Sequence, residues 1–387
     1  MSDAAAVIAL LPVGIAGYAY IGYPLALRAA ALLRAPVPVP PEPAEWPALT
    51  VTVPAYNAES SIRGVLQNIL ATDYPADRRQ IVVISDASTD RTDSMVRELE
   101  DEGVELVRLP VRRGKTAAEG AAARVARGSI IVNVDAGVRL LPHSLRALVR
   151  AFGDPSVGVA SGRDVTAADD STVQNAESGY VGYEMWLRGL ESRLGGIVGA
   201  SGCFFGIRRE LVDLSLPDAL SRDFASALIA RDHGYRSVSV PDAVCLVPQT
   251  RGLEAELERK ARTMARGLET LFYFRRLMNP WRFGGFAFRL ISHKLCRWLV
   301  SLSLPVAALA VLWWSAESET GRIVLAALLA GAAMGVAAMR WPRGRLAPRL
   351  MVIAGYLLAS NVAGALAWSR FFTRQRTAVW QPTSRPA

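Results

Sequence analysis

Three charged residues in this sequence have the types and positions needed to hold a nucleotide diphosphate. Asp86 and Asp135 each follow a strand-like run, and Lys115 opens a helical segment. In a sheet of parallel strands the carboxyl ends of the strands meet at one edge, which is where such folds bind ligands. One aspartate there can accept a base N–H, another can hold a divalent cation, and the lysine offsets phosphate charge.

Alternating strands and helices must position these side chains. Strand-like runs lie at 48–54, 80–85, 104–109 and 129–134, and helical segments lie at about 58–70, 90–102, 114–127 and 142–152. This alternation predicts a doubly wound, parallel sheet with helices on its faces. We therefore predict a soluble α/β domain that ends near residue 250.

Composition and charge exclude several classes of protein. With 387 residues, 51% of them apolar and 20% charged, the chain is not disordered. Residues 1–249 carry 24 basic and 29 acidic side chains, whereas residues 250–387 carry 20 and 6. A basic, apolar back half fits a membrane-surface protein and argues against nucleic acid as a partner. The three cysteines are too far apart for a disulfide framework or a zinc site.

Four apolar segments are long enough to span a membrane. The first, residues 4–27, contains no charge, and arginines follow it, which predicts an outside N-terminus and a cytoplasmic α/β domain. Three more spans are expected at about 297–315, 321–339 and 350–369. Four full spans would place the Arg-rich C-terminal tail outside, against the charge bias, so the side of the tail stays open.

These features divide the chain into five predicted regions. A Pro-rich stiff linker (35–47) precedes the predicted α/β domain. A basic amphipathic helix (254–279) that looks interfacial follows the domain. The predicted regions are an N-terminal transmembrane helix (1–34), the linker (35–47), the α/β domain (48–250), interfacial amphipathic helices (251–290), and a C-terminal transmembrane region with its tail (291–387).

From about residue 18 to 385 the sequence resembles the inverting, GT-A fold glycosyltransferases of family 2. The resemblance is to the membrane-bound bacterial branch, which is related to polysaccharide synthases. The ends of the first, second and fourth strands carry it, followed by several motifs in the order and spacing of that branch. These segments are Pro54-Ala55-Tyr56-Asn57, Ser85-Asp86-Ala87-Ser88-Thr89-Asp90, Asp135-Ala136-Gly137, YEMWLRGLES (183–192), GASGCFFGIRRE (199–210), RDF (222–224), RKARTMARG (259–267), SHKLCRW (292–298) and the tail W-x-P-x-x-R (380–385).

The resemblance implies a role for each matching residue. Asp223 would be the general base that takes the proton of an acceptor hydroxyl. Lys115 would lie near the nucleotide, and Asp135 would help to bind the sugar donor and a Mg²⁺ or Mn²⁺ ion. The uracil and ribose pocket would be lined by Pro54, Tyr56 and Asp86, and the diphosphate or the acceptor would be faced by Trp186, Arg259, Lys260 and Arg262.

Four polar positions of the family pattern are changed. Gly137 stands where the pattern has the second carboxylate of D-x-D, and Arg222 where it has an acid before the base. Gly120 stands where the pattern has an Asn after the Lys motif, and Gln249 where it has an acid near the end of the last strand. These departures favour a non-catalytic, glycosyltransferase-like membrane subunit, whereas Asp86, Lys115, Asp135 and Asp223 oppose that alternative.

Structural roles compete with the functional ones at single residues. Asp86, Asp135 and Asp223 could each cap a helix or turn, and Lys115 could be a surface residue. Trp186 could belong to a core, and Glu184 and Glu191 could form a packed or ion-paired helix face.

The favoured function is a multi-pass inner-membrane glycosyltransferase with a cytoplasmic catalytic domain. It would move a sugar from a UDP-sugar to a polysaccharide or lipid-linked acceptor with inversion, in contact with membrane lipids. Polysaccharide-export proteins are possible partners. A transferase onto polyprenyl phosphate is a second alternative.

Overall fold

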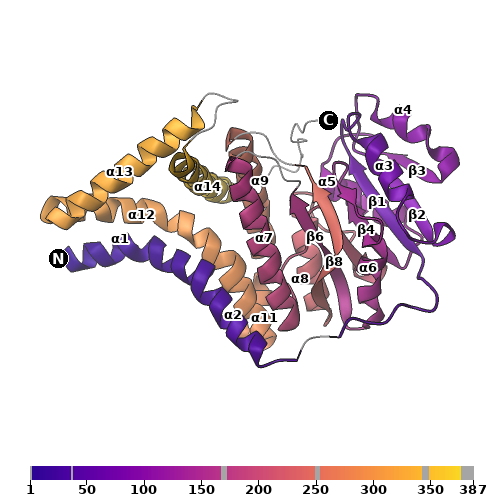
Figure 1. Cartoon of the computed structure of the whole chain (residues 1–387), viewed down its shortest axis with the longest axis horizontal. Helices are drawn as coiled ribbons and strands as arrows, with labels where there is room; N and C mark the ends of the chain where they lie inside the picture. The colour runs from indigo at the N-terminus through magenta and orange to yellow at the C-terminus, as the bar shows by residue number, and fades with distance from the viewer. Residues whose placement is uncertain (1, 36–37, 167–171, 249–252, 342–347, 376–387) are drawn as a thin grey trace.

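An eight-stranded mixed sheet forms the centre of the α/β half of the molecule, residues 49–273 (Figure 1). The computed structural model describes residues 2–35, 38–166, 172–248, 253–341 and 348–375. The strand order is β3-β2-β1-β4-β7-β6-β8-β5. The strands are β1 (Leu49–Ala55), β2 (Arg79–Ser85), β3 (Val104–Arg108), β4 (Ile130–Val134), β5 (Arg139–Leu140), β6 (Val157–Thr166), β7 (Phe204–Arg208) and β8 (Arg236–Val247).

The first four strands pair in parallel, as the sequence predicts. β1 lies between β2 and β4, so the segments after β1, β2 and β4 emerge at the same edge of the sheet. The later strands differ from a purely parallel sheet, because β7 is antiparallel to both β4 and β6 and β5 is antiparallel to β8. The predicted α/β, Rossmann-like and mostly parallel GT-A architecture is thus confirmed, with an antiparallel element that the sequence did not reveal.

Helices cover both faces of the sheet. One face packs against α3, α4 and α6, whose apolar side chains join those of β1, β2 and β4 in the main core. The other face packs against α5 and α8. The helices of this half are α3 (Ile62–Leu70), α4 (Thr92–Arg97), α5 (Lys115–Val125), α6 (Ser144–Arg150), α7 (Thr172–Arg193), α8 (Arg222–Asp232) and α9 (Leu253–Tyr273), with short turns η2 (Ala76–Arg78), η3 (Glu100–Glu102), η4 (Ala151–Gly153) and η5 (Arg209–Leu211).

Four described helical segments are long and apolar enough to cross a membrane, one N-terminal and three C-terminal, as predicted. They are Asp3–Leu32, Gly285–Glu317, Glu319–Met339 and Arg349–Phe372. Figure 1 shows them on one side of the molecule, with α7 and α9 between them and the sheet. Their elements are α1 (Ser2–Gly17), η1 (Tyr18–Gly22), α2 (Tyr23–Leu32), α11 (Gly285–Leu290), η7 (Ile291–Leu295), α12 (Cys296–Glu317), α13 (Glu319–Met339) and α14 (Arg349–Phe372).

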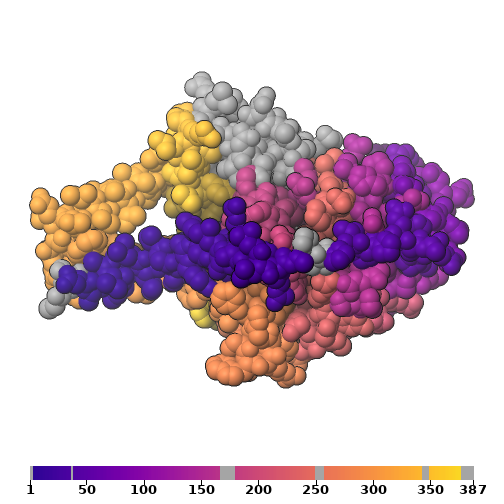
Figure 2. Space-filling model, turned by 60° about the horizontal axis from the view of Figure 1, so that its bottom comes forward, coloured from indigo at the N-terminus to yellow at the C-terminus, as the bar shows by residue number. Residues whose placement is uncertain are grey.

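Three apolar clusters join the α/β half to these helices. The α2 helix packs on α7 through Tyr23 and Leu187, and α9 packs on α14 through Leu268 and Trp368. A third cluster joins α8 to η6 (Arg275–Met278), α10 (Pro280–Phe283) and α11. Figure 2 shows the N-terminal helices lying along one face of the molecule. The apolar helices are therefore packed directly on the α/β half.

Candidate active site

The segments that follow β1 and β2 are tied to each other at the edge of the sheet. Pro54 is the penultimate residue of β1 and pairs with Ile84 of β2. The side-chain oxygen of Asn57 accepts the backbone N–H of Thr89 at 2.8 Å. The Arg112 guanidinium lies 3.6 Å from the centre of the Tyr56 ring. Pro54 and Tyr56 therefore lie at the same edge of the sheet, and their role in a base-binding pocket stays a prediction.

Asp86 holds the loop that leads into α5. It is buried, and its two carboxylate oxygens accept the backbone N–H groups of Arg113 and Gly114, both at 2.7 Å. The helix that directly follows Asp86 is instead capped by Asp90, whose carboxylate accepts the N–H of Thr92 at 3.0 Å. Asp86 thus sets the position of Lys115, the next residue after this loop.

Lys115 and Asp135 meet beside the loop that precedes β7. The Lys115 ammonium donates to Asp135 Oδ1 at 2.5 Å and to the carbonyl oxygen of Gly202 at 2.6 Å. The backbone N–H of Asp135 in turn donates to the carbonyl oxygen of Cys203 at 3.0 Å. Both side chains are about one fifth exposed, so a ligand in solution can reach them.

Asp223 approaches the same loop from the first turn of α8. Its Oδ1 accepts the Ser221 hydroxyl at 2.5 Å, and a Cβ at Gly202 would lie 3.2 Å from its Oδ2. Gly202 therefore has Lys115 on its carbonyl and Asp223 against its Cα. The three predicted residues Lys115, Asp135 and Asp223 surround one short loop, although they come from three different elements.

Buried charge shapes the electrostatics behind this group. Burial lowers the pKa of Lys115, but the carboxylates of Asp135, Glu119 and Asp223 outweigh it and hold that pKa above its ordinary value. Burial raises the pKa of Glu119 to about 7, although Lys115 and Arg222 lower it. Lys115 therefore stays a cation, and Glu119 is a buried carboxyl that titrates near neutrality.

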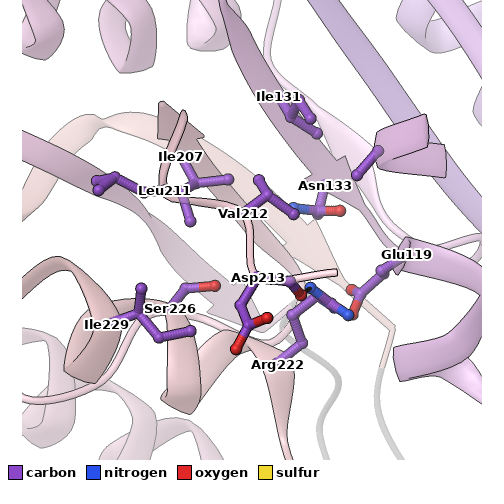
Figure 3. Close-up of a pocket in the computed structure, with 11 residues that line it drawn as sticks. Glu119, Ile131, Asn133, Ile207, Leu211, Val212, Asp213, Arg222, Ser226 and Ile229 are labelled. Atoms are coloured by element: carbon purple, nitrogen blue, oxygen red, sulfur yellow. Dashed lines mark hydrogen bonds and ion pairs between the residues drawn. The ribbon is translucent and has the colours of Figure 1, made fainter. Parts of the chain in front are cut away.

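Two of the changed family positions lie in contact. Arg222 is buried and points toward Glu119 of α5 (Figure 3). Its Nη1 donates to the carbonyl oxygen of Asp213 at 3.0 Å, and its Nε lies 3.9 Å from Glu119. A Cβ at Gly120 would lie only 3.1 Å from the Arg222 Nη2. The glycine at 120 therefore makes room for the arginine at 222.

The cations predicted on the amphipathic helix do not join the Gly202 group as a set. The Lys260 ammonium donates to Ser360 at 2.9 Å and lies 3.6 Å from the centre of the Tyr356 ring, both in α14. Lys260 therefore faces an apolar helix, and Arg259 and Arg262 stay untested predictions. Trp186 lies on α7 and is 43% exposed, with its ring 5.9 Å from that of Tyr183.

Arg266 is the α9 cation that reaches the catalytic side, and sequence reasoning missed it. Its Nη2 donates to the hydroxyl of Thr116 and to the carbonyl oxygen of Leu220, both at 2.6 Å. Its charge also acts on Asp223. The signal was present, because Arg266 follows Arg262 by four residues and so shares its helix face.

A divalent cation would have to use Asp135 together with ligand oxygens. Within the described ranges no three His, Cys, Asp or Glu side chains form a metal-binding group. Mg²⁺ is commonly held by one or two carboxylates plus substrate phosphates, and Asp135 is about one fifth exposed with Lys115 on only one of its oxygens. The residues present therefore fit a metal that arrives with a diphosphate. Gln249 and the 380–385 motif lie outside the described residues.

Residues 50–214 match a family model described as Glycosyl transferase family 2. A protein from Mesorhizobium japonicum named N-acetylglucosaminyltransferase is 29% identical over 236 residues, which cover 55% of this chain and 54% of that protein. One of the same name from Bradyrhizobium diazoefficiens is 26% identical over 315 residues, covering 73% and 64%. The chain thus spans between half and two thirds of the length of these relatives.

A solved structure shares the fold over nearly the whole chain. It is the mannosyltransferase PcManGT from Pyrobaculum calidifontis in complex with GDP-Man and Mn²⁺, with a TM-score of 0.71 and 24% identity. The match covers 95% of this chain and 99% of that one, so it includes the apolar helices. The likeness establishes the fold, which agrees with the architecture expected from the sequence.

Proposed function

We propose that this chain, whose residues 50–214 match the Glycosyl transferase family 2 model, moves a sugar from a UDP-sugar to a membrane-associated acceptor, a lipid-linked sugar or a polysaccharide, with inversion. The relatives named N-acetylglucosaminyltransferase make UDP-GlcNAc the first donor to test. The observation that carries this proposal is the convergence of Lys115, Asp135 and Asp223 on the Gly202 loop.

Each of these side chains has a distinct task in the proposed transfer. The diphosphate would lie against Lys115, whose permanent positive charge opposes the charge of the leaving group. Asp223 would accept the proton of the acceptor hydroxyl as that oxygen attacks the anomeric carbon. The bond from the anomeric carbon to the diphosphate breaks in the same step, UDP leaves with its electron pair, and a single displacement inverts the configuration.

A divalent metal would support the departure of UDP. Asp135 is the side chain that would hold it, and the ion would neutralise charge on the diphosphate. The Mn²⁺ in the mannosyltransferase with the shared fold supports the use of a divalent cation. Because Lys115 already sits on Asp135 Oδ1, we expect donor and metal to bind together rather than the metal alone.

The structure bears on the non-catalytic alternative. Arg222 and Gly120 are the changed positions that suggested it, yet they contact each other and leave the Gly202 loop intact. These two changes are therefore compatible with an active enzyme. Polyprenyl phosphate as the acceptor remains the other candidate, favoured by the docking of the apolar helices on the α/β half.

The test is nucleotide release by the detergent-purified chain from a panel of UDP- and GDP-sugars. Membrane lipid serves as the acceptor source, and each reaction is run with Mg²⁺, with Mn²⁺ and with EDTA. We expect metal-dependent release from one UDP-sugar, with UDP-GlcNAc tested first. Release from no donor, together with no binding of UDP by calorimetry, would favour the non-catalytic alternative.

A further inference from the structure

Lys294 carries an ammonium group without a hydrogen-bond or ion-pair partner among the described residues. It lies in the π-helical turn η7, within the apolar segment Gly285–Glu317, and is half-buried. Its one described contact is with an aromatic face, since the ammonium lies 5.6 Å from the centre of the Phe224 ring. A charge at such a place is costly unless an anion compensates it.

The carboxylates near Lys294 are already occupied. Glu184 accepts His293 Nε2 and Arg297 Nη1, both at 2.8 Å. Glu191 accepts His293 Nδ1 at 2.7 Å and the Tyr23 hydroxyl at 2.6 Å. Arg188 Nε also lies 3.6 Å from Glu184. The polar partners of both carboxylates are therefore other residues, and neither carboxylate is paired with Lys294.

The contacts of His293 with Glu184 and Glu191 also fix the direction in which Lys294 points. Both Glu184 and Glu191 lie on α7, so His293 locks η7 against that helix. Successive residues of a helix point in different directions, and Lys294 is thereby turned toward a different neighbour. A Cβ at Gly199 would lie 3.5 Å from its Cε and 3.7 Å from its Nζ.

Lys294 therefore reaches the same loop as the expected base. Gly199 and Gly202 are the two ends of a four-residue stretch, with Lys294 at the first and Asp223 at the second. The Ala200 N–H donates to the backbone oxygen of Asp223 at 3.4 Å, which ties this stretch to α8. An anionic group on Lys294 would thus sit close to the place where the acceptor hydroxyl must lie.

We propose that Lys294 binds the phosphate of a lipid-linked acceptor, a sugar carried on polyprenyl phosphate or diphosphate, whose sugar hydroxyl gives its proton to Asp223. The inference rests on the proposed function. A lipid source is favoured over a soluble phosphate because Lys294 belongs to a membrane-spanning segment, so its ligand arrives where that segment meets the α/β half. The test must distinguish binding of the lipid phosphate from binding of two soluble anions, inorganic phosphate and UDP.

The test is binding of undecaprenyl phosphate to the detergent-purified chain, titrated by native mass spectrometry without donor. We expect Lys294→Gln to weaken this binding at least tenfold and Lys294→Arg to stay within about threefold of the wild type, because arginine keeps the charge. Arg322→Gln, which removes an exposed cation from the first turn of α13, should bind like the wild type. Inorganic phosphate should not compete at millimolar concentration.

Kinetics then separate this inference from the proposed function. With a phosphate-linked acceptor, Lys294→Gln should raise the acceptor KM by tenfold or more and leave the KM for UDP-GlcNAc unchanged. Equal lipid binding by the wild type and Lys294→Gln, no lipid binding by either, or a change in the donor KM alone would each overturn the role of Lys294. Failure of the wild type to turn over any donor would instead count against the proposed function.

Discussion

Arg222 is one of the four positions at which this sequence departs from the expected family pattern, and its side chain turns away from solvent. It turns into the space between α5 and α8, where Asp213 and Thr116 carbonyl oxygens accept its guanidinium protons. Gly120 leaves that space open. Arg222 and Gly120, two departures from the family pattern that favoured the non-catalytic alternative, are therefore one paired change. Neither replaces a group on the loop that Lys115 and Asp223 share.

The pairing predicts a coupled response to mutation. Gly120→Asn should destabilise the fold by about 1–3 kcal/mol, because the new side chain overlaps a guanidinium held by two carbonyl oxygens. In an Arg222→Ala background the same change should cost clearly less. Thermal unfolding of the purified chain measures both. Gly64→Asn in α3 is the control, since a Cβ at Gly64 meets nothing within 4 Å. Equal costs in the two backgrounds would refute the pairing.

At the scale of elements, the buried carboxyl of Glu119 lies between cations of the two helices α5 and α8, which cover one face of the sheet. Glu119 of α5 lies between Lys115 on its own helix and Arg222 on α8. Burial outweighs both cations and raises the pKa of Glu119 to about 7. Between pH 4.5 and 7 the folded chain therefore keeps this proton while the unfolded chain has lost it. Stability falls as pH rises through that window and is level above it.

Glu119→Gln should remove this pH dependence. The wild type should lose stability relative to the variant as pH rises from 4.5 to 7, by a total on the order of 3 kcal/mol. The difference between the two melting temperatures, measured in detergent across that range, checks it. Glu102→Gln, at an exposed position in η3, should show no such trend. A melting-temperature difference that stays constant with pH would contradict the buried, protonated state of Glu119.

The sequence predicted the first half of the sheet and not the second. β1 to β4 are short apolar runs bounded by polar loops, so their pattern is plain in the sequence. β7 follows a long helix and pairs antiparallel between β4 and β6, a placement decided by contacts between residues more than 40 positions apart. Local periodicity contains no information on such pairing.

The sequence likewise predicted some residues of the candidate site and missed others. Asp86, Lys115, Asp135 and Asp223 were predictable because they lie in motifs next to strand or helix ends. Arg266 and Lys294 reach the site from helices outside the sheet, and Lys260 turns to α14 instead. Which side of a helix meets the α/β half depends on tertiary packing, and the sequence alone does not define it.

At the scale of the whole molecule, the apolar helices pack directly on the α/β half. Three clusters join them to α7, α8 and α9, and α8 carries Asp223, which reaches the Gly202 loop. The five predicted regions remain a prediction, as does the cytoplasmic side of the α/β half.

The most direct test of the central account is sugar transfer by Asp223→Asn. Wild-type chain and variant are given labelled donor from the panel, divalent metal and lipid acceptor, and the label in the lipid or glycan product is counted. We expect the variant to lose at least a hundredfold in turnover while binding UDP with unchanged affinity, because the amide cannot accept the acceptor proton. Transfer by Asp223→Asn at the wild-type rate would show that the proton goes elsewhere and would contradict the account.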